Sequence, residues 1–164
     1  MAAKVKAVPA GTHTITPHLV VRGADKAIEF YKKAFGAEVK GVHHTPDGKV
    51  MHAAIKIGDS TIYMADEFPG MGPKAPETLG GTPVVLNLYR EDIDKLFNQA
   101  VAAGATVTMP LANQFWGDRY GQLKDPFGHG WALGQHIEDV APAELERRGK
   151  EAFAQMAKGK AHGA

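Results

Sequence analysis

Cysteine is absent from the 164-residue sequence, and its absence removes three kinds of chemistry. Without thiols the chain forms no disulfide, offers no cysteine nucleophile and builds no thiolate metal site. A protein without disulfides suits a reducing compartment, so we expect this one in the cytoplasm, although a chain without cysteine is also compatible with export.

Long apolar runs and a strong net charge are also missing. The first 12 residues lack the apolar stretch of a secretion signal, and no later run approaches the ~20 apolar residues of a membrane-spanning helix. The formal net charge is +1, so charge gives no reason to expect a nucleic acid or a membrane as a partner. The sequence also lacks a phosphate-cradling glycine loop and a Gly-x-Ser-x-Gly nucleophile turn.

The residues that are present form two similar halves. Thr16-Pro17 returns as Thr82-Pro83, and Gly36-Ala37 returns as Gly104-Ala105 after the second helical pattern. Hydrophobic periodicity predicts, in order, a strand, a helix and three strands in the first half, at 15–21, 24–35, 38–44, 51–57 and 61–65. The second half repeats that order, at 83–89, 92–103 and 105–110, with a hairpin between 115 and 138.

This repeat predicts an α+β fold of two β-α-β-β-β modules. Each module alone has a half-buried sheet, so we expect the modules to form one curled mixed sheet around a shared cavity, with the helices outside. The expected boundaries are a flexible lead at 1–12, module one at 13–66, a linker at 67–81, module two at 82–140, a C-terminal helix at 141–158 and a disordered tail at 159–164. The linker is rich in glycine and proline and is long for a compact domain, which indicates a lid or an inter-module connection.

One stretch, residues 115–138, concentrates rings and polar groups around a tight turn. It holds both tryptophans, and Asp125-Pro126-Phe127-Gly128 is a strong turn signal. Apolar rings with a few polar groups are typical of the wall of a small-molecule pocket. A well-packed hairpin at the edge of the core explains the same composition equally well.

Several polar side chains are candidates for a ligand site. Arg119 offers a planar fork for a carboxylate or phosphonate, with Trp116 able to stack beside it. The alternative is an ion pair of Arg119 with Asp118 or Asp125 that only braces the hairpin. Asp66 and Glu67, at the end of a strand, are expected to be solvated.

The eight histidines fall into two groups. His13, His43, His44 and His162 are expected to be exposed, and His129, in the turn, is expected to bond a backbone carbonyl. Strand alternation places His18 and His136 on the inner faces, with the face of His52 less certain. These three could contact a ligand, stay buried as structural residues, act as a general base or bind a metal.

The paired modules resemble the vicinal oxygen chelate superfamily, which includes glyoxalase I, bleomycin resistance proteins and extradiol dioxygenases, and in particular its PhnB-like branch. The resemblance covers roughly residues 14–148. The motifs that carry it are Thr16-Pro17-His18-Leu19, the helix Ala27–Ala37, Trp116-Gly117-Asp118-Arg119-Tyr120-Gly121, Asp125-Pro126-Phe127-Gly128-His129 with Trp131, and His136-Ile137-Glu138-Asp139-Val140.

The resemblance implies metal-ligand positions at the first and last strands of each module. In this sequence we place them at Thr16 and Tyr63, and at Pro83 (or Thr82) and Ala132. Because none of these is a good ligand for zinc, nickel or iron, we expect no metal cofactor. Tyr63 could instead donate a hydrogen bond into the cavity.

We therefore predict a small-molecule-binding protein of the bleomycin-resistance kind, with a metal-free pocket for an aromatic or anionic compound. The predicted ligand-binding residues are His18, His52, Tyr63, Phe115, Trp116, Arg119 and His136, and no catalytic residue is assigned. The resemblance implies a homodimer. The alternative function is a metal-dependent lyase, isomerase or dioxygenase using histidines at shifted positions, and a weaker one is a structural domain with a filled hollow.

Overall fold

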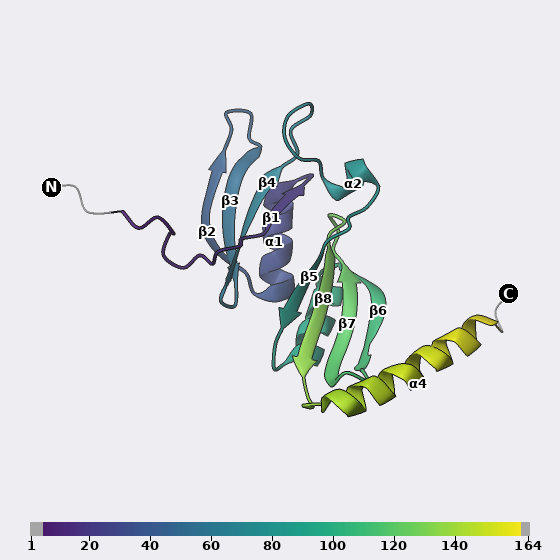
Figure 1. Cartoon of the computed structure of the whole chain (residues 1–164). Helices are drawn as coiled ribbons and strands as arrows, with labels where there is room; N and C mark the ends of the chain where they lie inside the picture. Colours follow the sequence, from purple (N-terminus) through teal and green to yellow (C-terminus); the bar gives the residue numbers. More distant parts are fainter. Residues whose placement is uncertain (1–4, 162–164) are drawn as a thin grey trace.

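The computed structural model of the chain describes residues 5–161, and it has two β-α-β-β-β modules in sequence (Figure 1). Module one consists of β1 (His18–Val21), α1 (Ala24–Phe35), β2 (Glu38–His44), β3 (Val50–Ile57) and β4 (Ser60–Asp66). After the short helix α2 (Pro76–Leu79), module two consists of β5 (Val85–Tyr89), α3 (Ile93–Ala103), β6 (Thr106–Asn113), β7 (Asp118–Lys124) and β8 (Gly130–His136). Helix α4 (Pro142–Ala161) follows.

The two sheets have the same topology, which confirms the expected α+β fold. Their strand orders are β1-β4-β3-β2 and β5-β8-β7-β6, with the first strand parallel to the last and the other pairs antiparallel. The expected single curled sheet around a shared cavity is not closed within this chain. Instead, the hydrogen-bonded ladders remain two separate four-stranded sheets (Figure 1).

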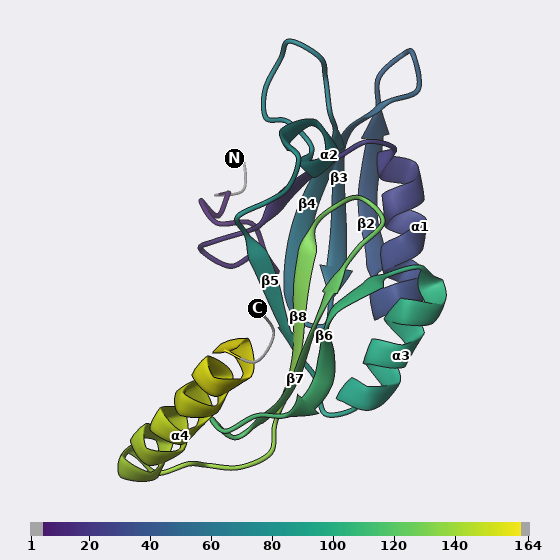
Figure 2. The same cartoon turned by 90° about the vertical axis from the view of Figure 1, so that its right-hand side faces the viewer.

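Helices α1 and α3 lie on the same side of the two sheets and pack against each other (Figure 2). In α1 the residues Ala27, Ile28, Tyr31 and Ala34 recur at helical spacing and are all buried. Gly36 ends this helix with a φ of 68°, a left-handed conformation that glycine adopts without steric cost. The helices therefore cover one face of each sheet and hold the modules side by side.

Within the described residues, no helix packs over the opposite face of either sheet (Figure 2). Along β3, Ala53, Ile55 and Ile57 are buried towards α1, whereas the residues that alternate with them, His52, Ala54 and Lys56, are partly exposed. The alternation is that of a strand with one face in the core and one face open. We call these helix-free surfaces the open faces of sheet one and sheet two.

The segment between the modules, residues 67–81, has more regular structure than a simple linker. It carries α2, and Thr78 of that helix donates a hydrogen bond of 2.6 Å to Glu67, which also accepts one from Arg22 at 2.9 Å. Phe68 and Met71 form an isolated bridge at its beginning. The segment is thereby tied to the end of module one.

The two ends of the chain differ from the expected boundaries. Residues 1–4 and 162–164 lie outside the described part, so the predictions for them stay predictions. Within the lead, the carbonyl of Gly11 accepts a hydrogen bond of 3.1 Å from Thr61. Helix α4 continues to Ala161, so residues 159–161 of the expected disordered tail are helical.

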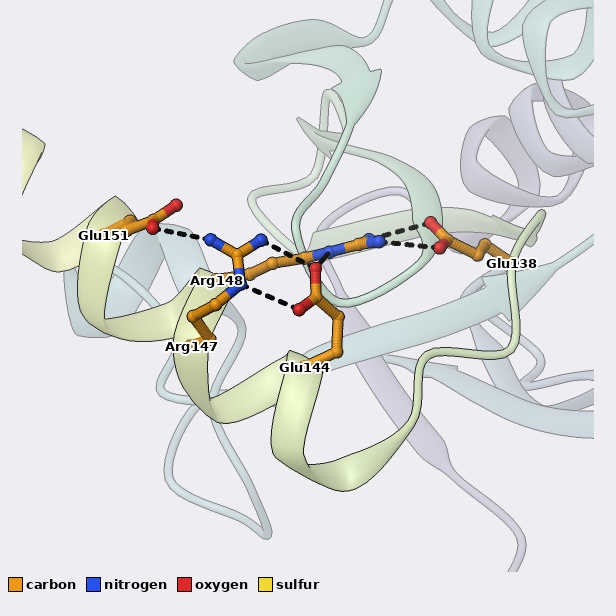
Figure 3. Close-up of polar contacts among 5 residues, drawn as sticks. All are labelled: Glu138, Glu144, Arg147, Arg148 and Glu151. Carbon is orange, nitrogen blue, oxygen red and sulfur yellow. Dashed lines mark hydrogen bonds and ion pairs between the residues drawn. The ribbon is translucent and has the colours of Figure 1, made fainter.

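Helix α4 projects from module two and is held at its base by charged side chains (Figures 1 and 3). The guanidinium of Arg148 donates two hydrogen bonds of 2.8 Å to Glu138 and one of 2.8 Å to Glu144. Arg147 bridges Glu144 and Glu151 on the helix itself. Arg147 and Arg148 lower the pKa of Glu144 to about 2. Among the described helices, none combines the length and the apolar character needed to cross a membrane.

Candidate functional site

Three of the predicted site residues meet on the open face of sheet one. Parallel pairing of β1 with β4 sets His18 beside Tyr63, and His52 comes from the adjacent strand β3. The His52 and Tyr63 rings meet edge to face with their centroids 4.9 Å apart, and the His18 and His52 centroids lie 6.5 Å apart. The structure thus brings together a group of two imidazoles and a phenol at partly exposed positions.

A hollow of about 330 Å³ adjoins this group on the His18 side. Its floor is the open face of sheet one, and its wall is the segment that follows β4. The residues that line it are His18, Val20, Thr45, Met51, Ala65, Asp66, Phe68, Met71, Gly72 and Pro73. We call it the His18 hollow. The 67–81 segment, expected to be a lid or an inter-module connection, supplies one wall of this hollow.

His18 is the nitrogen-bearing side chain in an otherwise mostly apolar hollow. Burial lowers the pKa of His18, and the neighbouring His52 lowers it further. The ring is therefore neutral at pH 7, with one nitrogen donating and the other accepting. Such a group can orient a ligand by hydrogen bonding, whereas it would be a weak contact for an anion.

The open face of sheet two carries a second polar group, centred on Asp118. Its Oδ2 accepts hydrogen bonds from the Tyr89 hydroxyl at 2.8 Å and from Trp116 Nε1 at 3.1 Å. Its Oδ1 lies 2.8 Å from Nδ1 of His136, which is the cross-strand partner of Asp118. On the far side of the imidazole, Nε2 lies 2.9 Å from the exposed carboxylate of Asp139.

The charges in this group stabilise one another. Hydrogen bonds to Asp139 and Asp118 raise the pKa of His136 above its ordinary value. Burial acts to raise the pKa of Asp118, but the bonds from His136, Tyr89 and Trp116 outweigh burial and lower it. Because both ring nitrogens donate in the protonated form, the arrangement favours an imidazolium between two carboxylates. His136 is thus the cationic group of this face.

Small residues lie beside this polar group, as the alternation predicted. Gln122 and Tyr120 pair with Ala132 and Gly134 across β7 and β8, so these two positions share a face with His136. The space above Gly134 is filled by the ring of Tyr89, because a Cβ at Gly134 would lie 3.0 Å from it, and Ala132 is almost fully buried.

Phe115 and Arg119 lie elsewhere. The Phe115 ring contacts Trp116 at 5.1 Å and Phe153 of α4 at 6.2 Å between centroids, so it joins the sheet to the C-terminal helix. Arg119 donates two hydrogen bonds of 2.6 Å to Asp94 of α3. It therefore points to the helix-covered side of sheet two, away from His136.

Arg119 forms a structural ion pair, but with Asp94 and not with the partners that the sequence suggested. The sequence suggested Asp118 or Asp125 as its carboxylate, but Asp118 belongs to the opposite face and Asp125 is bonded elsewhere. Asn113 Oδ1 accepts a third bond from Arg119, at 3.0 Å. Both nitrogens that would form a bidentate fork to a ligand are engaged by Asp94.

The remaining histidines within the described residues behave as the sequence predicted. His129 Nε2 lies 3.1 Å from the backbone carbonyl of Val20, so it links the β7–β8 turn to module one. His43 and His44 are exposed, and His44 contacts Asp25 on the helix side of module one.

The strand register corrects two of the implied metal-ligand positions. Thr16 lies before β1, and the residue paired with Tyr63 is His18. In module two the partner of Ala132 is Asn87, not Pro83 or Thr82. The corrected set contains one imidazole, a phenol, an amide and a methyl group, which does not fit a zinc, nickel or iron centre. Within residues 5–161, no three histidine or acidic side chains are grouped closely enough to hold a metal ion.

Sequence reasoning missed the loop wall of the His18 hollow and the partners of His136. Phe68 and Met71 stood out only as part of an irregular glycine- and proline-rich segment. Asp118 could have been found, because strand alternation around the Asp125 turn places it opposite His136. Tyr89 gave no comparable signal, since its contact with Asp118 depends on the parallel pairing of β5 with β8.

Comparisons with known proteins agree with this architecture. The family model described as Glyoxalase/Bleomycin resistance protein/Dioxygenase superfamily matches residues 12–133. An uncharacterised protein of Mycobacterium tuberculosis is 48% identical over 135 residues, which are 80% of this chain and 79% of the relative.

Solved structures are similar over most of the chain. TioX from Micromonospora aligns with a TM-score of 0.61 and 25% identity, covering 75% of this chain and 98% of TioX. A Bacillus cereus structure described as a putative 3-demethylubiquinone-9 3-methyltransferase, PhnB protein, aligns with a TM-score of 0.57 and 22% identity, covering 75% and 99% of the two chains. The second likeness, at 22% identity, concerns the fold alone.

Proposed function

Because the chain belongs to the glyoxalase/bleomycin resistance protein/dioxygenase superfamily, we propose that it is a small-molecule-binding protein whose site needs no metal. The observation that carries this proposal is the His18 hollow, with its largely apolar walls and a neutral imidazole. Its volume of about 330 Å³ lies at the lower end of the range of roughly 300–1,000 Å³ typical of ligand pockets. A compact aromatic compound with one hydrogen-bonding group matches these walls.

The open face of sheet two supports the anionic part of the proposal. His136 supplies a cation, and the rings of Trp116 and Tyr120 meet at 5.5 Å beside it. A ligand carboxylate can replace the exposed Asp139 at Nε2 while Asp118 continues to hold Nδ1. Arg119 could serve as the anion contact only after releasing Asp94.

We also propose that the protein acts as a cytoplasmic homodimer. Each open face leaves side chains such as Met51, His18 and Tyr89 exposed along a sheet, and a second copy would cover them. Covering the faces would enclose the ligand between sheets and raise its affinity by removing it from water. Sedimentation of the untagged protein at micromolar concentration tests the dimer, and a purely monomeric result would contradict it.

The binding proposal is tested with 2-naphthol, a neutral aromatic with one hydroxyl group. Calorimetry of the full chain should show saturable binding that persists in a chelator, with the naphthol recovered unchanged. His18→Ala should weaken binding by about 0.5–1.5 kcal/mol, the net contribution of one hydrogen bond. His44→Ala is the matched control, because His44 lies on the helix side and contacts Asp25.

Two results would overturn the proposal. Equal effects of His18→Ala and His44→Ala would remove the His18 hollow as the binding site. Stoichiometric metal in purified untagged protein, lost on His18→Ala, would replace metal-free binding by the metal-dependent enzyme. Elemental analysis before and after dialysis against zinc, nickel and iron measures the second outcome directly.

A further inference from the structure

A second hollow, of about 330 Å³, lies at the junction of the two modules. Its walls come from the segment before β1, from the β3–β4 turn and from β5, with Trp131 of β8 at its base. It shares no lining residue with the His18 hollow. Figure 1 shows the segment before β1 crossing the part of module one that faces module two. We call this hollow the junction pocket.

The base of the junction pocket is apolar and fixed in position. Trp131 is almost fully buried, and its indole N–H is already donated to Asp125 at 2.9 Å. The ring therefore presents only carbon surface to the pocket. Ile57, Ile62 and the partly buried Leu88 complete this surface. An apolar group of modest size can rest on it without leaving a polar atom unpaired.

The mouth of the junction pocket carries opposite charges. Asp59 lies in the β3–β4 turn, and one of its carboxylate oxygens accepts a bond of 2.9 Å from Ser60. Arg90 follows β5, and its one ion pair among the described residues is a contact of Nη2 with Asp92 at 3.2 Å. A guanidinium has five N–H donors, so most of those of Arg90 remain available to a ligand. One module thus contributes an anion and the other a cation.

We propose that the junction pocket binds a free α-amino acid with an apolar side chain. The side chain packs on Trp131 and Leu88, the carboxylate meets Arg90, and the ammonium group meets Asp59. Each exposed ion pair is weak by itself, but two of opposite sign fix the orientation of a zwitterion. A ligand held this way contacts both modules, so it stabilises their present arrangement by mass action.

The two tryptophans make this proposal testable at the level of single residues. The indole N–H signals of ¹⁵N-labelled full-length protein comprise Trp116 and Trp131, and Trp116→Phe assigns them. L-phenylalanine should shift the Trp131 signal saturably and leave the Trp116 signal in place. Phenylethylamine, which lacks the carboxylate, and 3-phenylpropanoate, which lacks the ammonium group, should each bind about two- to fivefold more weakly.

Substitutions locate the contacts. Arg90→Gln should remove the preference for phenylalanine over phenylethylamine. Asp59→Asn should remove the preference for phenylalanine over 3-phenylpropanoate. Leu88→Phe should fill the pocket and abolish the Trp131 shift. Leu111→Phe is its control, because Leu111 is a partly buried leucine outside the pocket. Arg90→Gln and Asp59→Asn change surface residues, so they test the two charge contacts even if the Leu88→Phe protein fails to fold.

Three outcomes would overturn the inference: no saturable Trp131 shift at millimolar phenylalanine, a shift retained in a folded Leu88→Phe protein, or a Trp116 shift alone. A Trp131 shift that depends on protein concentration and not on phenylalanine would show a second copy occupying the pocket, which also contradicts it. None of these results affects the His18-dependent binding of 2-naphthol. The proposed function and this inference are therefore tested separately.

Discussion

The hydroxyl of Tyr31, in the helix of module one, donates a hydrogen bond of 2.6 Å to the carboxylate of Asp125 in the β7–β8 turn of module two. Asp125 is almost fully buried, and it also accepts bonds from Trp131 Nε1 and from the backbone N–H groups of Phe127 and His129. A buried carboxylate with four donors is fully compensated. The β7–β8 turn, which the sequence suggested as part of a ligand site, therefore links the two modules.

Tyr31→Phe should destabilise the protein by about 1–3 kcal/mol, because it removes a charge-assisted bond to a buried carboxylate. Urea unfolding followed by circular dichroism measures the change. Tyr120→Phe is the matched control, since the Tyr120 hydroxyl accepts a bond from Gln122 at a partly buried site and should cost less. Equal losses for the two variants would show that Asp125 does not depend on Tyr31.

Gly117→Ala should be more damaging than an ordinary glycine substitution. Gly117 has a φ of +97°, and a Cβ there would lie 2.2 Å from the carbonyl oxygen of Glu138. The backbone at Glu138 would have to move, so we expect a loss of more than about 1 kcal/mol in urea unfolding. Gly41→Ala, which meets no atom within 4 Å, is the control. A stable Gly117→Ala protein would contradict the close approach.

The fold was predictable because two independent signals agreed. The repeated strand–helix pattern and the glycine ends of α1 and α3 specified the order and length of the elements. The start of β1 was predicted three residues early, because Pro17 lacks an N–H for the ladder and Ile15 stays exposed. The sequence did not determine whether the two sheets join into one curled sheet or stay separate, because this depends on the contact between α1 and α3. The apolar pattern of these two helices is the same in both arrangements.

The candidate site was predictable where alternation within one sheet decided it. His18, Tyr63 and His136 face as expected, since each side is fixed by its own strand. Arg119 was not predictable in the same way, because Asp94 approaches from a helix 25 residues away. Thr16 and Pro83 were misplaced as ligand positions because the register of a parallel pair depends on which residues of two distant strands lie side by side. The sequence alone does not specify this register.

Arg119→Ala should lower the thermal midpoint and leave the affinity for 2-naphthoate unchanged. The reason is that its fork is held by Asp94 on the helix side of sheet two. Calorimetry and thermal unfolding on the same preparation measure both quantities. Asp94→Asn should lower the midpoint in the same way, and the double variant should add little. A loss of naphthoate affinity specific to Arg119→Ala would return this residue to the ligand site.

Arg148→Gln should loosen the base of helix α4. Arg148 joins Glu138, which lies before the helix, to Glu144 within it (Figure 3). Hydrogen exchange of the α4 amides should accelerate in this variant and, to a smaller extent, at high salt, which screens exposed pairs. Lys150→Gln is the control, because Lys150 pairs with Glu146 on the same helix. Equal exchange in both variants would show that the Glu138 contact does not hold the helix.

His136 gives the protein a pH dependence whose sign is fixed by its two carboxylate partners. The folded pKa of His136 is raised above the unfolded value of about 6.5, so protonated His136 stabilises the fold below that pH, and this stabilisation is lost as pH rises through the folded pKa. The difference in unfolding free energy between the wild type and His136→Gln should therefore shrink from pH 6 towards pH 8. NMR titration of the His136 ring should give a pKa above that of a free histidine, and Asp139→Asn should lower it while Asp118 continues to hold Nδ1. A ring that titrates below 6.5 would mean that desolvation outweighs the two carboxylates, and would remove His136 as the cation of the open face.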